Sequence, residues 1–353
     1  MFSGNEKKLK LAEPLLSTWS SESHLMSMIL NQQNAYQWLM NNYIQIIGCY
    51  IEKEERTLFC FFPKHDPMDN DFRIHAWNTC PFLDLEYVSK KYVNEFYGSI
   101  VDYVKVSIDN DYYVYLDLSQ KKLSNGIKKM ITHKTFIYGY DFNKELIYVA
   151  DHYDAGKYAL SEIKFTNFID AYEDANLFLN KPSEENIYEK RKILICKSRS
   201  VSYKYNVDWF KMQLKDYLNS EYSLGCIASI NNNVNNEFVY GIKCYDLIIK
   251  YINKLMEFRG SYREDAKIFT FLCDHKKMLK LHIQYFLENN MVKFDSIELE
   301  GYDFLFNLSD LTKILFLKYM MSHKIELLEK IINNLNLMRC KEYELLMRLY
   351  NKI

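Results

Sequence analysis

Residues 132–154 read THKTFIYGYDFNKELIYVADHYD and predict two β-strands joined by a tight turn. Aromatic and apolar residues lie on both sides of GYDFNKE, a segment rich in turn formers, which is typical of an antiparallel hairpin. His133 opens the first strand and Asp151 closes the second, so the hairpin brings the two side chains next to each other. An aspartate beside a histidine orients the imidazole ring of a general base in nucleophilic catalysis. The hairpin therefore predicts part of a catalytic triad and leaves the nucleophile to be found.

The length and composition indicate a soluble chain of two domains. Its 353 residues exceed the size at which one hydrophobic core normally keeps growing. Hydrophobic residues make up 48% and charged residues 26%, and the net charge of −1 offers no electrostatic surface for nucleic acid. No apolar run reaches the 18 residues of a membrane span, and the charged N-terminus lacks the apolar segment of a secretory signal. We expect a cytoplasmic protein with neither nucleic acid nor a membrane as its partner.

The motifs of common cofactor and metal sites are missing from the sequence. Eight cysteines are scattered without the CxxC spacing of a zinc site or a disulfide framework, which favours reduced thiols. Gly-rich phosphate loops and GxSxG elbows are also missing. The segment HDPMDND, residues 65–71, gathers carboxylates and a histidine but lacks the ligand order of an EF-hand, so we interpret it as a solvated loop. The sequence predicts no cofactor and no metal.

The C-terminal part of the chain has a helical pattern. No proline follows Pro182, and proline inside a helix costs about 3 kcal/mol. Residues 240–258, 266–290 and 325–350 repeat apolar side chains every three to four positions. The segment CDHKKM, residues 273–278, is interpreted as the charged surface of one of these helices. We therefore predict an all-α domain over residues 201–353.

The first part of the chain has a different pattern, a helix followed by short β-rich runs. The helical pattern covers residues 23–42, and a second helix is predicted over residues 83–104. The predicted strands are 43–52, 56–62, 112–119, 134–142, 146–151 and 193–197. The polar segment 180–192 and the last strand indicate a boundary near Ser200. Residues 1–200 are thus predicted to form an α+β domain with an antiparallel sheet.

A longer pattern around the hairpin resembles a known family. The chain reads DYYVYLDLSQ from residue 111, then His133 followed by YGYD, then VAD and GKYALSEI. This pattern resembles the N-terminal domain of butirosin-biosynthesis-protein-H-like proteins, relatives of the C39-like peptidases. The resemblance covers most of residues 10–200, and the helical remainder, with YGIKCYD and CDHKKM, is similar to the domain that commonly follows. It implies a papain-like (C39-like) fold for the N-terminal domain.

The resemblance also implies an activity. The family includes acyltransferases that move an acyl group from a carrier-protein thioester to an amine in antibiotic assembly. By resemblance, His133 is the general base and Asp151 its orienting partner. The implied partners are an acyl carrier protein or peptidyl carrier protein, docked by the helical domain, and a small amine acceptor. The expected function is therefore acyl transfer or amide formation in specialised (nonribosomal peptide or antibiotic) biosynthesis.

The nucleophile is where the chain departs from the family. Members carry a cysteine at the start of the first helix, followed by small and apolar residues four, five and eight positions later. Leu25, Met26 and Ile29 fit that spacing if the nucleophile position is Ser21. No cysteine occurs before Cys49, so the expected thiol is missing. Serine acts as the nucleophile, or the site is inactive, or a serine was introduced in place of cysteine.

Each candidate residue also has a structural interpretation. Ser21 and Ser23 are good helix N-caps, and His24 is expected at the surface. Cys80 is a second candidate nucleophile because it precedes a predicted helix that would lower the pKa of its thiol, but a buried structural thiol fits as well. An aspartate at a strand end, such as Asp151, also forms turns.

Two other functions remain open on the sequence alone. The same triad, Ser21, His133 and Asp151, would serve an amidase or peptidase if water rather than an amine released the acyl group. A binding or scaffold protein that kept the fold and lost the thiol would need no triad. The residue at position 21 is the feature that separates catalytic from non-catalytic interpretations.

Overall fold

The computed structural model divides the chain into two compact units. It describes residues 4–51, 56–62, 75–123, 132–153, 157–179, 192–223, 238–258 and 260–353. The N-terminal unit comprises Met1–Ala35 with Asn70–Ser202, and the helical unit comprises Tyr36–Asp69 with Tyr203–Ile353. The N-terminal unit ends close to the predicted boundary at Ser200, and residues 180–191 of the predicted linker lie outside the described residues. The described residues 36–51 and 56–62 belong to the helical unit, whereas the predicted division at residue 200 assigns them to the N-terminal domain.

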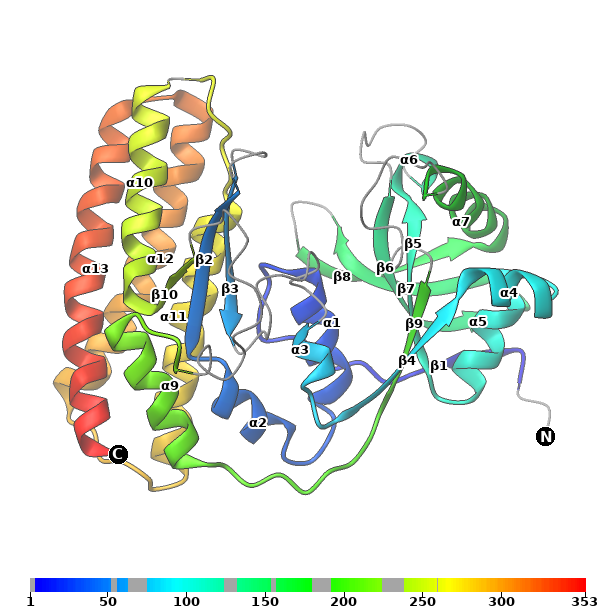
Figure 1. Ribbon diagram of the computed structural model, residues 1–353, viewed down its shortest axis with the longest axis horizontal. Helices are drawn as coiled ribbons and strands as arrows, with labels where there is room; N and C mark the ends of the chain where they lie inside the picture. The colour runs from blue at the N-terminus through cyan, green and yellow to red at the C-terminus, as the bar shows by residue number, and fades with distance from the viewer. Residues whose placement is uncertain are drawn as a thin grey trace. The chain divides into compact units, whose positions relative to one another are not determined.

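A seven-stranded antiparallel sheet forms the centre of the N-terminal unit (Figure 1). Its order is β4-β9-β5-β6-β7-β8, and β1 pairs with the far end of β6. The strands are β1 (Glu6–Lys8), β4 (Leu83–Ser89), β5 (Tyr113–Ser119), β6 (Thr132–Asp141), β7 (Leu146–Tyr153), β8 (Lys157–Lys164) and β9 (Lys192–Ser198). Strands β6 and β7 form the predicted hairpin. The predicted α+β class is confirmed.

Helices cover both faces of this sheet. Figure 1 shows α1 and α3 on one side of it and α4, α5 and α7 on the other. The helices of the unit are α1 (Ser20–Ile29), α3 (His75–Asn78), α4 (Lys90–Phe96), α5 (Ile100–Asp109), α6 (Gln120–Leu123) and α7 (Phe165–Leu179). Leu116, Ile137 and Val149 of the sheet share a core with α4, α5 and α7. On the other face, His24 of α1 stacks on Phe136 with 4.9 Å between the ring centroids.

The residues of the YGYD motif have structural roles around the hairpin. A Cβ atom on Gly139 would lie 2.5 Å from the carbonyl oxygen of Lys7, so only glycine lets β1 pair here. Asp141 then closes the turn into β7, because its Oδ1 accepts the backbone N–H groups of Asn143 at 2.9 Å and Lys144 at 3.0 Å.

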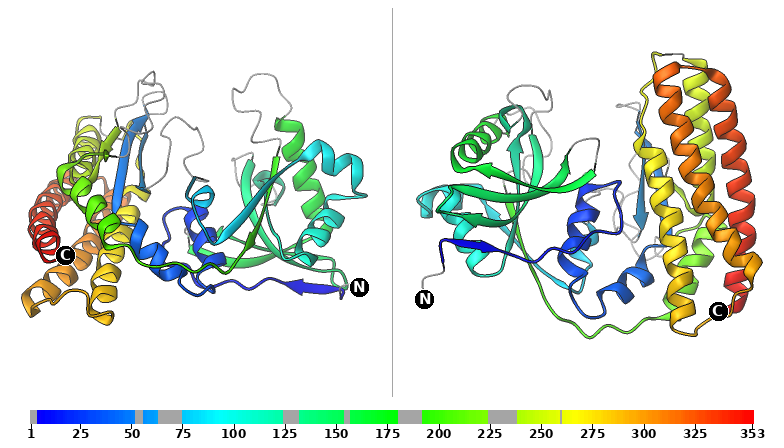
Figure 2. Two further views of the ribbon diagram at one scale, coloured as in Figure 1. Left: turned by 60° about the horizontal axis from the view of Figure 1, so that its bottom comes forward. Right: turned by 180° about the vertical axis from the view of Figure 1, so that it is seen from behind.

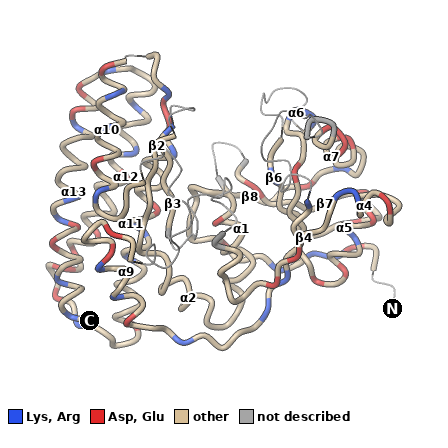
Figure 3. Tube along the Cα trace, in the orientation of Figure 1, with Lys and Arg blue, Asp and Glu red and all other residues tan. Residues whose placement is uncertain are grey.

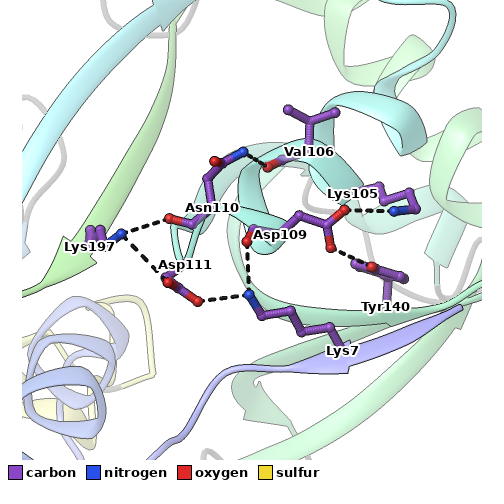
Figure 4. Close-up of polar contacts among 8 residues, drawn as sticks. All are labelled: Lys7, Lys105, Val106, Asp109, Asn110, Asp111, Tyr140 and Lys197. Atoms are coloured by element: carbon purple, nitrogen blue, oxygen red, sulfur yellow. Dashed lines mark hydrogen bonds and ion pairs between the residues drawn. The ribbon is translucent and has the colours of Figure 1, made fainter. Parts of the chain in front are cut away.

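The third residue of this motif, Tyr140, anchors the end of α5 (Figure 4). Its hydroxyl donates to Oδ1 of Asp109 at 2.5 Å. Lys7 of β1 donates to the backbone carbonyl of Asp109 and to the Asp111 carboxylate, and Lys197 of β9 ion-pairs with the same carboxylate. Lysines at a helix C-terminus satisfy its last carbonyl groups and interact favourably with the helix dipole. This cluster joins β1, β6 and β9 to α5.

Two predicted helices are divided in the structure. The predicted helix 83–104 begins as strand β4, because alternating side chains in LDLEYVS pair with β9, and continues as α4 and α5. The predicted helix 23–42 forms α1 and α2 (Ala35–Asn42), with Asn34 between them in the left-handed region at φ 70°. Asparagine tolerates that backbone conformation, which a continuous helix cannot contain.

The predicted all-α domain over residues 201–353 is helical in its described part except for one short strand, β10 (Phe238–Tyr240). This strand joins two strands of the first part of the chain in a three-stranded sheet, β10-β2-β3. Predicted strands 43–52 and 56–62 form β2 and β3, which pair with each other and not with the large sheet, and β2 pairs with β10 of the C-terminal part. An apolar pattern predicts a strand without identifying its partner. The remaining elements are β2 (Gln45–Ile51), β3 (Arg56–Phe62), α9 (Val207–Asn219), β10 (Phe238–Tyr240), η4 (Gly241–Lys243), α10 (Cys244–Glu257), α11 (Lys267–Glu288), α12 (Ser296–Ser322) and α13 (Ile325–Lys352).

Long helices make up most of the helical unit (Figure 2). A capping box between Asp295 and Glu298 begins α12, with each side chain accepting the other residue's backbone N–H. Gly301 lets α12 approach α13, since a Cβ atom there would lie 2.9 Å from the Leu345 side chain. Basic and acidic residues are interspersed along the described chain (Figure 3). Among the described residues, none of the helices has the length and hydropathy needed to cross a bilayer.

Candidate functional site

His133 and Asp151 lie close together at the end of the β6–β7 hairpin. The last residue pair between these strands is Phe136 with Ala150, and beyond it β6 pairs only with β5 while β7 pairs with β8. Nδ1 of His133 lies 3.6 Å from Oδ2 of Asp151. The predicted placement on adjacent antiparallel strands is confirmed, whereas the expected hydrogen bond between the two side chains is not formed at this distance.

The backbone fixes which nitrogen of His133 carries a proton. Nδ1 lies 2.7 Å from the carbonyl oxygen of Lys134, an atom that only accepts hydrogen bonds, so Nδ1 is the protonated nitrogen. The Asp151 carboxylate lies on the same side of the ring. This tautomer leaves Nε2 as the proton acceptor, which is the role of a general base. The His133 side chain keeps 28% of its surface exposed, whereas Asp151 is buried.

Side-chain alternation places the His133–Asp151 pair and helix α1 on different faces of the sheet. Asp151 lies two residues after Val149 and points to the same face of β7, and His133 is paired with Leu118. Val149 and Leu118 both belong to the core that α4, α5 and α7 share. Phe136 of β6 and His152 of β7, whose side chains point to the other face of the sheet, face α1. The structure therefore brings His133 and Asp151 together, and it does not show a hydrogen bond from either residue to Ser21.

Ser21 lies in the first turn of α1, as the resemblance requires. The N-cap of α1 is Trp19, so neither Ser21 nor Ser23 is the cap. The Ser21 side chain is fully buried, and its hydroxyl has no hydrogen-bond partner in the described part of the chain. Its backbone carbonyl accepts the indole N–H of Trp77 at 2.9 Å. A buried hydroxyl without a partner loses the free energy of its hydrogen bonds to water.

Ser23 contacts a histidine that the sequence analysis did not single out. Its Oγ lies 3.4 Å from Nε2 of His152, the residue after Asp151. The same Oγ donates to the Leu16 carbonyl oxygen at 2.8 Å, and a hydroxyl has one proton, so Nε2 of His152 donates to Ser23. In that state His152 cannot accept the Ser23 proton. The alternation of β7 could have identified His152 as the side chain facing α1.

His24 is buried, so the prediction of a surface residue is wrong. Its ring packs against Phe136, and its Nδ1 lies 3.3 Å from the Tyr158 hydroxyl. Burial lowers the pKa of His24 well below its usual value, and the nearby His152 and His133 lower it further. His24 is therefore neutral at physiological pH. Together with His133 of β6 and His152 of β7, it forms a group of three histidines near the ends of these strands.

Cys80 does not have the environment of a reactive thiol. It follows the short helix α3 and precedes strand β4, where a helix was predicted, so no helix N-terminus lies at its position. Burial raises the pKa of the Cys80 thiol to about 12. The thiolate is the nucleophilic form, so the structural interpretation of this residue holds.

The CDHKKM segment is part of a buried polar network and not, as predicted, a charged surface. His275 and Lys276 are both fully buried in the helical unit. Lys276 Nζ donates to Oε2 of Glu342 at 2.6 Å, and Tyr217 and Tyr245 donate to the same carboxylate at 2.7 and 2.6 Å. The helical pattern predicted the helix, but a charged sequence does not reveal a buried counter-charge 66 residues away.

No metal site is found in the described ranges, where no group of three or more His, Cys, Asp or Glu side chains is arranged to hold an ion. The HDPMDND segment lies outside the described residues. Cysteines 49, 60, 80, 196, 244, 273 and 340 are free thiols.

Comparisons with models of protein families and with curated proteins gave no match to this chain.

Proposed function

We propose that the N-terminal unit is a papain-like domain that accepts an acyl group from a carrier-protein thioester and passes it to an amine. Ser21 is the residue that takes the acyl group, and His133 is the base. Asp151 orients the base and places a negative charge beside it. The reaction belongs to specialised biosynthesis in the cytoplasm, where thiols such as the carrier's stay reduced. An acyl or peptidyl carrier protein and a small amine are the partners.

The chemistry needs one base and no cofactor. The nucleophile at position 21 adds to the thioester carbonyl, and its proton passes to Nε2 of His133. When the C–S bond breaks, His133 returns that proton to the carrier thiolate. The amine then attacks the acyl–enzyme, loses its proton to His133, and His133 protonates the departing oxygen or sulfur of residue 21. Because the thioester is already activated, ATP is not required.

The observation that carries the proposal is the His133–Asp151 pair. An imidazole whose Nδ1 proton is held by a backbone carbonyl, with a carboxylate at 3.6 Å and an unprotonated Nε2, is arranged as a general base. It heads a strand of an antiparallel sheet in the same unit as α1, whose first turn carries Ser21. Backbone N–H groups in such a turn stabilise a developing anion.

The proposal requires Ser21 and His133 to approach each other in the reacting state. Among the described strands, residues 132–135 of β6 pair with β5 alone. Because His133 and α1 lie on different faces of the sheet, the proposed mechanism includes a change in which this end of β6 turns the His133 side chain toward the first turn of α1.

A second candidate, a non-catalytic protein that binds acyl carriers, has an observation in its favour. A serine hydroxyl needs nearly complete base assistance to act as a nucleophile, and neither Ser21 nor Ser23 donates to a histidine. An amidase or peptidase would use the same groups and differ only in admitting water.

The test is covalent acyl transfer to position 21. Wild type, Ser21→Cys and Ser23→Cys are each incubated with an acyl thioester of a carrier protein and measured by intact mass. We expect slow or no labelling of wild type and one acyl group on Ser21→Cys, because a thiolate is the better nucleophile. Ser23→Cys is the matched control, since that position is equally buried. Labelling of neither variant, with binding of the acylated carrier retained, would establish the non-catalytic candidate instead.

A further inference from the structure

An outward face of α12 carries large apolar side chains at heptad spacing. The apolar residues on it are Ile297, Phe304, Leu311, Ile314 and Met321, and all five are exposed. The buried residues of the same helix, including Tyr302, Leu305 and Phe316, lie on the opposite side and pack into the bundle. A seven-residue repeat on an exposed helix face is the pattern of a helix that pairs with another helix. Helix α12 is drawn orange in the right-hand view of Figure 2.

The pattern is symmetric about the middle of the helix. Glu300, Asn307 and Lys318 complete the exposed stripe. A two-fold axis level with Ser309 would place Ile297 opposite Met321 and Phe304 opposite Ile314 of a second, antiparallel copy. It would also place Leu311 beside Asn307. At a rise of about 1.5 Å per residue, the matched stripe extends over about 36 Å.

The charges of the stripe match under the same symmetry. Its single acidic residue, Glu300, lies in the first half of α12, and its single basic residue, Lys318, in the second half. The two-fold axis that matches the apolar residues also sets Glu300 of one copy against Lys318 of the other, twice in a dimer. A parallel pairing would instead oppose like charges, which is unfavourable.

We propose that two copies of this chain associate through α12, antiparallel and about a two-fold axis level with Ser309. The interface is isologous, so each residue contributes twice, as in most homodimers. A single pair of helices is at the small end of specific interfaces, so a dimer with a dissociation constant in the micromolar range is expected.

The test is the dimer dissociation constant of the full chain, measured by sedimentation equilibrium. Leu311→Glu places one carboxylate per chain, and so two per dimer, in the apolar stripe. We expect the dissociation constant to rise about a hundredfold. Leu337→Glu on α13 is the matched control, because Leu337 is exposed to a similar extent (51% against 48%) but lies outside the stripe. It should leave the constant unchanged.

A charge reversal tests the register. Glu300→Lys and Lys318→Glu should each raise the dissociation constant about tenfold, since each opposes like charges twice, and the double variant should restore it. Thermal unfolding of each variant checks that the helical unit stays folded. A chain that remains monomeric well above micromolar concentration would overturn the proposal. So would a dimer that Leu311→Glu and the single reversals leave unchanged, because its partner surface would then be elsewhere.

Discussion

Nδ1 of His133 lies 3.6 Å from Oδ2 of Asp151, on two neighbouring strands at the point where they stop pairing with each other. The carbonyl of Lys134 already accepts the Nδ1 proton at 2.7 Å. In the proposed mechanism, Asp151 therefore acts on His133 mainly by its charge and less by selecting the tautomer.

The first prediction follows from that division of roles. In the Ser21→Cys background, Asp151→Asn should slow acylation about tenfold, or roughly 1.4 kcal/mol, because the carboxylate charge is lost while the carbonyl still holds the ring. The rate is measured in a single turnover by intact mass. Glu162→Gln, which removes an exposed carboxylate of β8, is the control. An equal loss in both variants would mean that Asp151 has no specific role.

The second prediction concerns the buried network of the helical unit. Glu342→Gln leaves the Lys276 ammonium buried without its counter-charge, and removing one partner of a buried ion pair costs about 3–5 kcal/mol. Urea denaturation followed by circular dichroism measures the loss. Glu344→Gln, on the same helix but exposed, should cost less than about 1 kcal/mol. Similar losses in the two variants would show that the network is not a main source of stability.

The third prediction is a pH dependence of stability. Burial lowers the pKa of His282 to about 4, against about 6.5 in the unfolded chain. Between these values the unfolded chain binds the proton and the folded chain does not. The contribution of His282 to the free energy of unfolding is therefore complete above about pH 6.5 and is lost as the pH drops. The loss reaches about 2 kcal/mol at about pH 5. His275, whose pKa is also lowered, adds to the same trend.

The His282→Asn variant isolates this contribution. Its free energy of unfolding should fall less steeply between neutral pH and about pH 5 than that of the wild type, whatever its stability at neutral pH. The measurement is urea denaturation of both proteins at several pH values. Identical pH slopes would mean that His282 is not buried as a neutral residue.

The hairpin and its His–Asp pair were predictable because they are local. Turn formers between two β-rich runs set β6 beside β7, and the positions of His133 and Asp151 follow from the antiparallel pairing. The face to which these side chains point was not predictable. Helices cover both faces of the sheet, so Ile137 and Phe136 on adjacent positions of β6 are both apolar, and the alternation that identifies a core face is missing.

Partners that lie far apart in the sequence were also not predictable. Strands β2 and β3 were recognised as strands, but the partner that places them in the helical unit is β10, whose three residues FVY are too short to predict. Likewise, Lys276 looks like a surface residue until Glu342 of α13 is placed beside it. Both errors come from contacts between residues far apart in the sequence.

The central claim is that position 21 and His133 act together, and the pKa of a thiol at position 21 tests it most directly. In Ser21→Cys, the rate of alkylation by iodoacetamide is measured against pH, with and without His133→Ala. A helix N-terminus and an imidazolium both favour the thiolate, so we predict a thiol pKa below the usual value of about 8.5 that rises when His133 is removed. A thiol pKa that is the same in both proteins would contradict the account.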